Sequence, residues 1–473
     1  MKMRATTDAH EQFIKMTQTP IPRLVCTLAG PTMVSMMISA AYNLADTYFV
    51  GQLGTSATGA VGIVFSLMAI IQAVGFTLGM GSGGVISRLL GEKRNTEAAE
   101  AASTAFFAAI AAGFIIMIPG LLFSNGLMRF LGATDTILPY AKSYAQYILY
   151  GAPIICTTFV MNNDLRAEGK AFFSMVGIAT GCILNVALDP VMIFTFHLGI
   201  AGAAIATIIS QSISFLILIS NYISHRTIIK LSFRHFSRRA SMHAEILKTG
   251  MPSFFRQGLA SIATIALNVS AAVYGDAAVA AMSIVGRAFF FLLAALLGFG
   301  QGFQPVAGYN YGAKCYTRLK EAYWFCVRVS FFGLLILGSV AFVFAPQIMA
   351  LFRRNDPQVI AIGALAFRAQ CAMMPLQTFV IISNMLFQSI GMAKQATWIS
   401  VLRQGFCFLP IILTFPRFFG LLGVQLSQPA ADCLTFFIAL KITFPFLHRL
   451  NDAIRSGGQE PAEQSVPSGE NHL

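Results

Sequence analysis

The sequence is short of charged residues. Of its 473 residues, 56% are hydrophobic and only 11% are Asp, Glu, Lys or Arg, whereas soluble globular proteins carry about 25%. A chain of this length with so few charges cannot cover a water-facing surface, which excludes soluble enzymes, repeat scaffolds and nucleic-acid-binding proteins. The net charge of +13 does not indicate a nucleic-acid partner, because the basic residues lie in short segments between apolar runs and form no single stripe.

Catalytic motifs are missing too. The sequence has no DDxxD motif for a prenyl diphosphate, no HExxH, no GxSxG with a usable His and no P-loop. The eight Cys form no CxxC pair and lie mostly in apolar runs, so we interpret them as small buried hydrophobic residues. We therefore expect no enzyme, no ATPase domain, no resident cofactor and no structural metal.

Long apolar runs are what the sequence does contain. A helix needs about 20 apolar residues to cross a bilayer, and a membrane β-barrel would instead need alternating segments of about ten residues. The runs do not alternate, so we expect an all-α membrane protein with twelve transmembrane helices. They lie near 22–50, 57–86, 100–124, 138–162, 171–195, 200–223, 249–273, 277–304, 321–345, 359–387, 395–415 and 419–446.

Lys and Arg are distributed unevenly between the connecting segments. Most fall in 87–97, 224–248 and 312–320, on the side that also holds both termini. The positive-inside rule then places both termini in the cytoplasm. We expect residues 1–20 to form a cytoplasmic N-terminal segment and 449–473, rich in Gly, Pro, Glu, Ser and Gln, to be a disordered cytoplasmic tail.

The chain is also an internal duplication. Pro31 and Pro252, Gly91 and Gly312, and Lys93 and Lys314 are separated by the same 221 residues, and the offset continues along nearly the whole half. We therefore expect two pseudo-symmetric six-helix lobes, 21–223 and 249–448, joined by a cytoplasmic linker, 224–248. Parallel repeats of this kind are typical of transporters with a site near the membrane midplane between the lobes.

Three acidic residues, Asp46, Asp189 and Asp432, lie clearly within spans, where a charge costs about 2.5–3.5 kcal/mol or more. Asp46 shares a helix face with Tyr42, and Asp189 shares one with Asn185. At the offset of 221, Asp46 becomes Leu267. The offset is one residue longer at Pro153 and Pro375 and at Gly169 and Gly391, and at that offset Asp189 becomes Ile411. If these acids only joined helices, the second lobe would need them too, so we interpret them as a site for H⁺ or Na⁺; the alternative is a pair of neutral acids bonded to neighbouring helices.

Other charges in the spans have more open interpretations. Asp432 fits a substrate contact and a structural hydrogen bond equally well. We expect Asp164 and Glu168 to form ion pairs with Arg166 and Lys170 at the membrane interface. The remaining candidates for the central cavity are basic, and snorkelling or pairing with the backbone explains each of them as well: Arg256, Arg368 and Arg403.

Several motifs in order resemble the multidrug and toxic compound extrusion (MATE) family, in particular its MepA-like bacterial branch. They are YNLADTYFVGQLG, NNDLRAEGK, LNVALDPVMIF, GIAGAAIATIISQ and GFGQGFQPVAGYNYGAK. The resemblance covers about residues 15 to 448. It implies two six-helix lobes around a central cavity and export of lipophilic organic cations by antiport with H⁺ or Na⁺.

The resemblance also implies roles for individual residues. The cation-coupling positions of the family match Asp46, Asn185, Asp189 and Thr207, and further polar positions of that lobe match Tyr42, Tyr144 and Asn162. A first-helix proline that bends on protonation matches Pro31. The branch with a carboxylate cluster in the second lobe is not matched, because the runs 249–273 and 359–387 contain no acid.

The working hypothesis is a multidrug efflux antiporter, acting as a monomer in the bacterial cytoplasmic membrane, among its lipids. The sequence leaves H⁺ and Na⁺ equally open. One alternative is a lipid-linked oligosaccharide flippase, which the second-lobe arginines would suit. A membrane-embedded enzyme is the other alternative, and the missing motifs argue against it.

Overall fold

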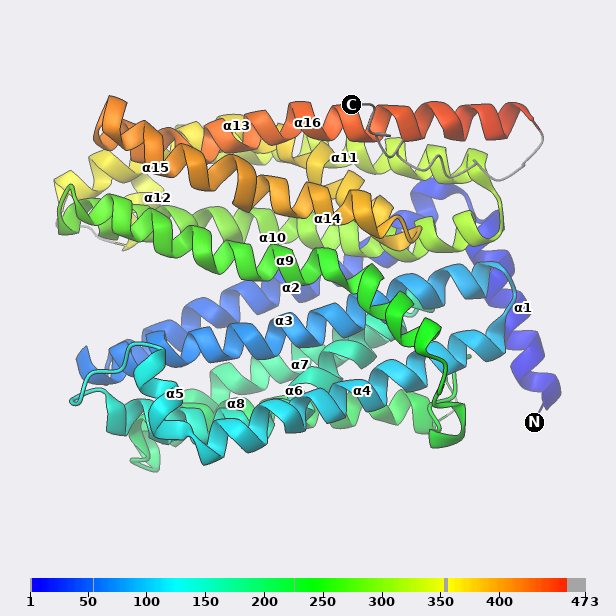
Figure 1. Cartoon of the computed structure of the whole chain (residues 1–473), viewed down its shortest axis with the longest axis horizontal. Coiled ribbons are helices and arrows are strands. Elements are labelled where there is room, and N and C mark those ends of the chain that lie inside the picture. The colour runs from blue at the N-terminus through cyan, green and yellow to red at the C-terminus, as the bar shows by residue number, and fades with distance from the viewer. Residues whose placement is uncertain (1, 54, 225, 353–355, 457–473) are drawn as a thin grey trace, which may run out of the picture.

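The computed structural model describes residues 2–53, 55–224, 226–352 and 356–456 of the chain, which are almost wholly helical and contain no strand. Apolar backbone in a bilayer must satisfy its hydrogen bonds internally, and helices do so within one segment. Twelve long helical rods follow one another (Figure 1). They are α2 (Ile21–Gly51), α3 (Thr55–Gly91), α4 (Asn95–Leu122), α6 (Leu138–Ala167), α7 (Ala171–Pro190) with η1 (Val191–Thr195), α8 (Gly199–Ile223), α9 (Ala240–Ala272), α10 (Asp276–Gly312), α11 (Tyr316–Val343), α13 (Pro357–Ser389), α14 (Ala393–Val401) with η3 (Leu402–Cys407) and α15 (Phe408–Phe419), and α16 (Leu421–Arg455).

The rods correspond one to one with the twelve predicted spans, and the all-α membrane fold is confirmed. Ten of them, within the described residues, are long and apolar enough to cross a membrane by themselves; α6 and α9 carry more polar residues. Short helices α1 (Lys2–Gln18), α5 (Ser124–Phe130) and α12 (Ala345–Phe352) lie at the ends of the rods. A 3₁₀ turn, η2 (Phe233–His235), lies in the connection from α8 to α9.

Some predicted boundaries differ from the structure. The linker was placed at 224–248, but α9 begins at Ala240, so its last nine residues are helical. The tail was expected from 449, but α16 continues to Arg455; the part of that prediction covering 457–473 lies outside the described residues. In both places a helix extends past the apolar run, because charged residues are good helix formers in water.

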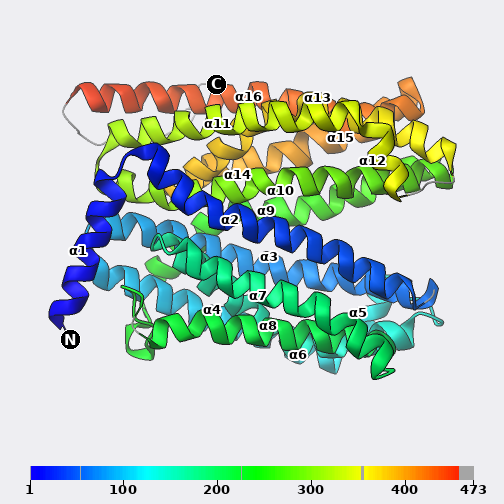
Figure 2. The same cartoon turned by 180° about the vertical axis from the view of Figure 1, so that it is seen from behind.

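The rods form two six-helix bundles lying side by side. Helices α2, α3, α4, α6, α7 and α8 make the N-bundle, and the rods from α9 to α16 make the C-bundle (Figures 1 and 2). Helix α1 and the connection from α8 to α9 lie at the same end of the molecule (Figure 1). We call this the linker end.

The duplication is visible in the backbone at the linker end. After α3, Lys93 has a positive φ of 62°, and after α10, Lys314 has a φ of 57°. The N–H of Lys93 donates to Leu90 O at 3.1 Å, and that of Lys314 to Tyr311 O at 3.0 Å. Because the left-handed region is unfavourable for Lys, the same unusual turn at two positions 221 residues apart shows that the halves share one backbone plan.

Glycines bring the two bundles into close contact. A Cβ on Gly91 would lie against the carbonyl oxygen of Tyr309, and one on Gly312 against that of Arg88, both closer than the 3.0 Å that real Cβ atoms keep. Deeper along the rods, Gly250 of α9 meets the Thr77 carbonyl of α3 in the same way. Only a residue without a side chain lets these backbones approach so closely.

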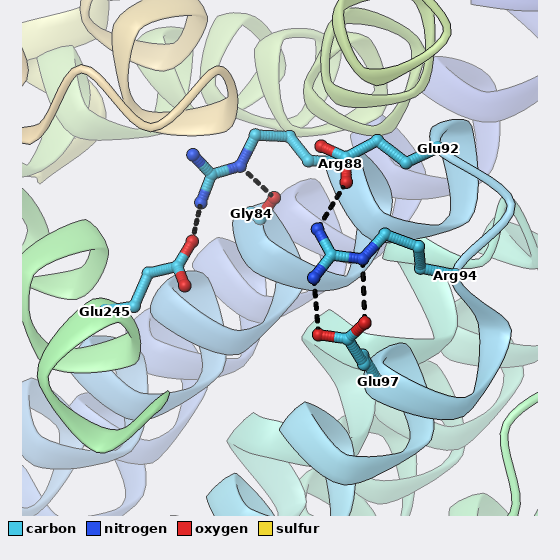
Figure 3. Close-up of polar contacts among 6 residues, drawn as sticks. All are labelled: Gly84, Arg88, Glu92, Arg94, Glu97 and Glu245. Atoms are coloured by element: carbon cyan, nitrogen blue, oxygen red, sulfur yellow. Dashed lines mark hydrogen bonds and ion pairs between the residues drawn. The ribbon is translucent and has the colours of Figure 1, made fainter. Parts of the chain in front are cut away.

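Hydrogen bonds also join the two bundles at the linker end. The Arg88 guanidinium on α3 donates to the Ile390 carbonyl at 3.2 Å and to the Glu245 carboxylate at 3.0 Å, and both partners belong to the C-bundle. Figure 3 shows Arg88 reaching across to Glu245, while Arg94 bonds Glu92 and Glu97 within the N-bundle. The bundles are therefore joined at the linker end by packing and by hydrogen bonds.

Glu168, just after α6, holds the start of the linker. Its buried carboxylate accepts from the N–H of Ile228 at 3.0 Å and of Ile229 at 3.3 Å, and Gln12 of α1 donates to its backbone carbonyl at 2.7 Å. Burial raises the pKa of Glu168 to about 7, although Lys170 and the two backbone donors act in the opposite direction. One carboxylate thus connects α6 to the linker.

Candidate functional site

A cavity of about 500 Å³ lies between the two bundles. Its apolar lining includes Met36 and Met68 from the N-bundle and Phe289 and Phe290 from the C-bundle. Flexible thioethers and aromatic rings adapt to ligands of different shape. A cavity of this size between two repeats is where a transporter of this architecture is expected to hold its substrate.

Two carboxylates lie behind the N-bundle wall. Asp46 of α2 and Asp189 of α7 are close enough to interact electrostatically, and Asp189 is fully buried. The Oδ1 atom of each is buried and has no hydrogen-bond partner. Two adjacent acceptors without donors in an apolar setting are costly when both are ionised, so this arrangement fits a bound proton or a small cation.

Asn185 and Thr207 connect Asp189 to α8. In the amide orientation that satisfies both neighbours, Asn185 Nδ2 donates to Asp189 Oδ2 at 3.1 Å, and Asn185 Oδ1 accepts from the Thr207 N–H at 3.1 Å and from its hydroxyl at 3.3 Å. Three of the four residues proposed from the sequence are therefore joined by hydrogen bonds. The fourth, Asp46, lies close enough to Asp189 for their charges to interact. Their roles stay predictions.

The three supporting residues lie around this group in different ways. Tyr144 of α6 is 1% exposed, and its hydroxyl bonds Thr207. Tyr42 lies near both carboxylates and lines the cavity. Asn162 also lines the cavity, but its amide donates to the Ser174 hydroxyl of α7 at 2.6 Å. Tyr42 and Tyr144 thus belong to the acidic group, and Asn162 joins α6 to α7.

Pro31 lies within α2, which is continuous from Ile21 to Gly51. The proline has no N–H to donate to the Thr27 carbonyl. Nearby hydroxyls also bond the helix backbone: Thr32 donates to the Leu28 carbonyl at 3.0 Å, and Ser35 donates to the Pro31 carbonyl at 2.9 Å. A proline removes a backbone hydrogen bond and weakens the helix at that point. The bend point predicted there has this local basis.

On the C-bundle wall, Asp432 is used structurally. Its carboxylate is 2% exposed and accepts from Gln377 at 2.6 Å, from Arg403 at 2.9 Å and from Gln428 at 3.1 Å. Arg403 and Gln428 line the cavity, and Asp432 lies behind them. Of its two open interpretations, the structure therefore supports the hydrogen-bonding one.

The three arginines proposed for the cavity separate into two groups. Arg256 and Arg403 line it. Arg368 does not: its guanidinium packs 5.6 Å from the Phe342 ring and donates to the Phe342 carbonyl at 3.1 Å, on α11. Of the two interpretations left open for Arg368, the structure therefore supports pairing with the backbone. Because Arg368 does not line the cavity, it no longer supports the alternative of a flippase.

The expected interfacial ion pairs are only partly present. Glu168 lies 3.9 Å from Lys170, but Asp164 accepts from the Ser82 hydroxyl at 2.6 Å. Arg166 instead reaches Asn163 and Gln301 of α10, and it lines the cavity. This contact between the bundles was missed, because its partners are 135 residues apart and one of them is an uncharged amide.

The MatE family model matches residues 31–191 and 252–413, one copy in each bundle. The chain belongs to the MatE family. This MatE protein is also similar to the "Multidrug export protein MepA" of Staphylococcus haemolyticus, with 27% identity over 93% of this chain and 97% of that protein. The expected resemblance to a MepA-like MATE transporter is thereby confirmed.

Solved structures agree with this assignment. The MatE protein matches the "Crystal structure of MATE in complex with MaL6" with a TM-score of 0.89 and 27% identity, covering 93% of this chain and 99% of that one. It also matches the "Outward-facing conformation of a multidrug resistance MATE family transporter of the MOP superfamily" with a TM-score of 0.89 and 27% identity, covering 93% and 98%. The chain is therefore a multi-pass membrane transporter.

Proposed function

We propose that this MatE transporter exports amphipathic drugs in exchange for H⁺ or Na⁺, and that the coupling ion binds at Asp46 and Asp189. The observation that carries the proposal is the pair of buried carboxylate oxygens without donors. Either ion suits them, because oxygen ligands bind Na⁺ and protons alike.

The position of the pair suggests how the two ligands are coupled. Asp46 lies on α2, and the same helix contributes Ser39, Tyr42 and Asn43 to the cavity wall. When a cation neutralises the carboxylates, their repulsion is removed and α2 and α7 repack, with Pro31 as the weak point of α2. A wall that repacks changes substrate affinity, and by linkage the substrate changes ion affinity by the same factor.

The cavity supports a broad choice of substrate. Its methionine and phenylalanine side chains bind flat apolar molecules by dispersion, and the rings attract a positive charge. The relatives named as multidrug export proteins support this breadth. We propose lipophilic organic cations as one substrate class, transported by a monomer.

The membrane orientation is part of the proposal. The linker end carries Arg88, Lys93 and Arg94 together with the basic segment after α8, so we place this end and both termini in the cytoplasm. We propose that the transporter lies in a bacterial cytoplasmic membrane. The cavity lies beyond the closed linker end, as expected for a substrate that leaves outward.

The test uses proteoliposomes loaded with ethidium. An inward H⁺ gradient is imposed in one arm and an inward Na⁺ gradient in another, with Asp46→Asn and Asp189→Asn beside the native chain. We expect efflux under one gradient and a loss of about tenfold or more in either variant, as for removal of one member of a cooperating pair. Asp276→Asn, at the exposed start of α10, is the matched control and should transport normally.

Either of two results would contradict the proposal. Gradient-driven efflux that survives both N-bundle variants would make the carboxylates structural. Efflux that is absent under both gradients in the native chain would remove drug antiport itself.

A further inference from the structure

The charge of the cavity wall is of one sign. The described residues that line the cavity include three arginines, Arg166, Arg256 and Arg403, and no Asp or Glu. The three acids within the spans discussed above, Asp46, Asp189 and Asp432, are not among the residues that line it. A wall with this composition does not resemble a site built for cations alone.

Two of the three arginines have protein partners. Arg166 donates to the Asn163 and Gln301 amides, and Arg403 is paired with Asp432 at 2.9 Å and with Gln377 at 2.9 Å. Their donors are largely committed to holding helices together. They set the local charge but have little freedom to bind a ligand directly.

Arg256 of α9 differs from both. Among the described residues it forms no hydrogen bond and no ion pair, and it lies close enough to Arg403 for the two positive charges to interact. The carboxylate of Asp432 pairs with Arg403 and not with Arg256. A charged side chain in a span is expensive unless it is paired, so Arg256 lacks the counter-charge that its position requires.

A second side chain at this cavity also lacks a partner. Gln370 of α13 lines the cavity, is 4% exposed, and its Oε1 has no hydrogen-bond partner. Buried side-chain polar atoms are nearly always hydrogen-bonded in folded proteins. The guanidinium of Arg256 needs an anionic acceptor, and the Gln370 amide oxygen needs a hydrogen-bond donor. Together they indicate a polar ligand that carries both an anionic group and a donor group.

We propose that the C-bundle wall is an anion subsite, in which Arg256 binds the carboxylate, sulfonate or phosphate group of an amphipathic substrate. The planar guanidinium binds such a group through two parallel hydrogen bonds. Phe289, Phe290 and Leu293, which line the same cavity, hold its apolar body. A molecule with a cationic group as well places that group towards the N-bundle, where Asp46 and Asp189 supply negative charge.

This inference rests on the proposed drug export and narrows its substrate class. It predicts that zwitterionic amphipaths bind better than otherwise identical cations. It makes no claim about the coupling ion, so the two proposals are tested by different measurements.

The test compares a rhodamine dye that has a free carboxylate with its methyl ester, which differs only by masking the anion. Equilibrium binding of each to the purified full-length chain in detergent is followed by fluorescence anisotropy. We expect the acid to bind about tenfold more tightly than the ester, as for one charge-assisted bidentate contact. Added salt should weaken binding of the acid and leave the ester almost unchanged.

Variants then identify the arginine. Arg256→Gln should weaken acid binding about tenfold and leave ester binding unchanged, and Arg256→Lys should restore part of the preference, because the ammonium keeps the charge but not the fork. Arg368→Gln is the matched control: the same change in the same bundle, at a guanidinium outside the described cavity lining. If Arg256→Gln does not fold, the comparison of acid and ester on the native chain still decides.

Three results would overturn the proposal. In the first, the acid binds no more tightly than the ester, or does not bind at all. In the second, Arg256→Gln weakens binding of both dyes equally. In the third, phosphatidylglycerol in mixed micelles, but not phosphatidylcholine, displaces the acid from the protein, which would assign the arginines to a lipid headgroup. Loss of the acid preference with intact gradient-driven efflux would leave the proposed antiport standing.

Discussion

The two bundles share a backbone plan and differ in charge. In the N-bundle, Asn162 on α6 donates to the Ser174 carbonyl at 3.3 Å, and in the C-bundle Asn384 on α13 donates to the Ala396 carbonyl at 2.6 Å. Both pairs are separated by twelve residues and lie at matching positions of the repeat. The duplicated contacts are those that join helices.

The charged residues do not follow the repeat. Leu267 stands where the first half has Asp46, and Gly181 stands where the second half has Arg403. In the N-bundle, one carboxylate oxygen each of Asp46 and Asp189 lacks a donor, and in the C-bundle Asp432 accepts from several donors. The two bundles therefore share a symmetric frame, but the charged residues placed in it differ. That difference suits a protein that handles two ligands.

The largest expected effect is on gradient-driven efflux, and it distinguishes Asp189 of the N-bundle from Asp432 of the C-bundle. Asp189→Asn should reduce gradient-driven efflux by about tenfold or more, because one of the two charges that bind the ion is lost. Asp432→Asn should keep the dependence on the gradient, because Asp432 already has three donors. Initial efflux rates from proteoliposomes, with and without the gradient, make this comparison. Equal loss in both variants would erase the distinction between the bundles.

Replacing Asp by Asn should lower thermal stability more at Asp432 of the C-bundle than at Asp189 of the N-bundle. Asp432→Asn leaves Arg403 without its counter-charge, and removing one partner of a buried pair costs about 3–5 kcal/mol. Asp189→Asn removes repulsion with Asp46 and should not lower the melting temperature. Thermal unfolding in detergent, followed by tryptophan fluorescence or scattering, measures both. A lower melting temperature for Asp189→Asn than for Asp432→Asn would contradict the roles assigned here.

The glycine contacts test the symmetric frame itself. Gly91→Ala and Gly312→Ala each place a Cβ against a carbonyl of the other bundle, and overpacking costs about 1–3 kcal/mol. We expect similar losses of stability, because the two contacts are equivalent by the repeat. Gly258→Ala is the control, since its Cβ would meet nothing within 4 Å. A large loss in one variant and none in the other would show that the halves are not equivalent at this contact.

The smallest expected effect concerns Glu168, which has no acidic counterpart at Ile390 in the second half. Its folded-state pKa of about 7 lies above the ordinary 4.5, so the folded state holds this proton more tightly than the unfolded chain does. The contribution of protonated Glu168 to the free energy of unfolding is complete below pH 4.5 and is lost as pH rises through about 7.

Hydrogen exchange at Ile228 and Ile229, corrected for intrinsic rates, measures that effect. Protection should fall between about pH 5 and about pH 8 in the native chain. Glu168→Gln should remove the pH dependence, whereas Glu245→Gln, at a half-exposed carboxylate, should keep it. Protection that rises with pH would mean that the ionised carboxylate is the better anchor.

Most of the frame could be predicted from the sequence. A bilayer requires long apolar helices, so the apolar runs predicted the twelve helical rods. The constant offset between Gly91 and Gly312 predicted the internal repeat. The spacing of Asp189 and Asn185 placed both on one face of a helix. Each of these inferences depends on local pattern or on a repeated interval, which a single sequence contains.

The remaining features depend on how helices turn towards one another. The sequence left open whether Arg368 faces the cavity or pairs with the backbone, because nothing along α13 indicates which side faces inward, and it packs on Phe342. Arg166 was expected to bind an acid nearby and binds Gln301 of the other bundle. Asp432 could be assigned only once Gln377 and Arg403 were seen to donate to it.

The glycine contacts at the linker end bear on the origin of the chain. Gly91 meets residue 309 and Gly312 meets residue 88, and these four positions exchange under the repeat offset of 221. A contact in which residue i meets j and j meets i is the signature of an interface between two identical subunits. The join between the bundles therefore has the reciprocal geometry that the pairing of two identical half-length chains would leave inside one polypeptide.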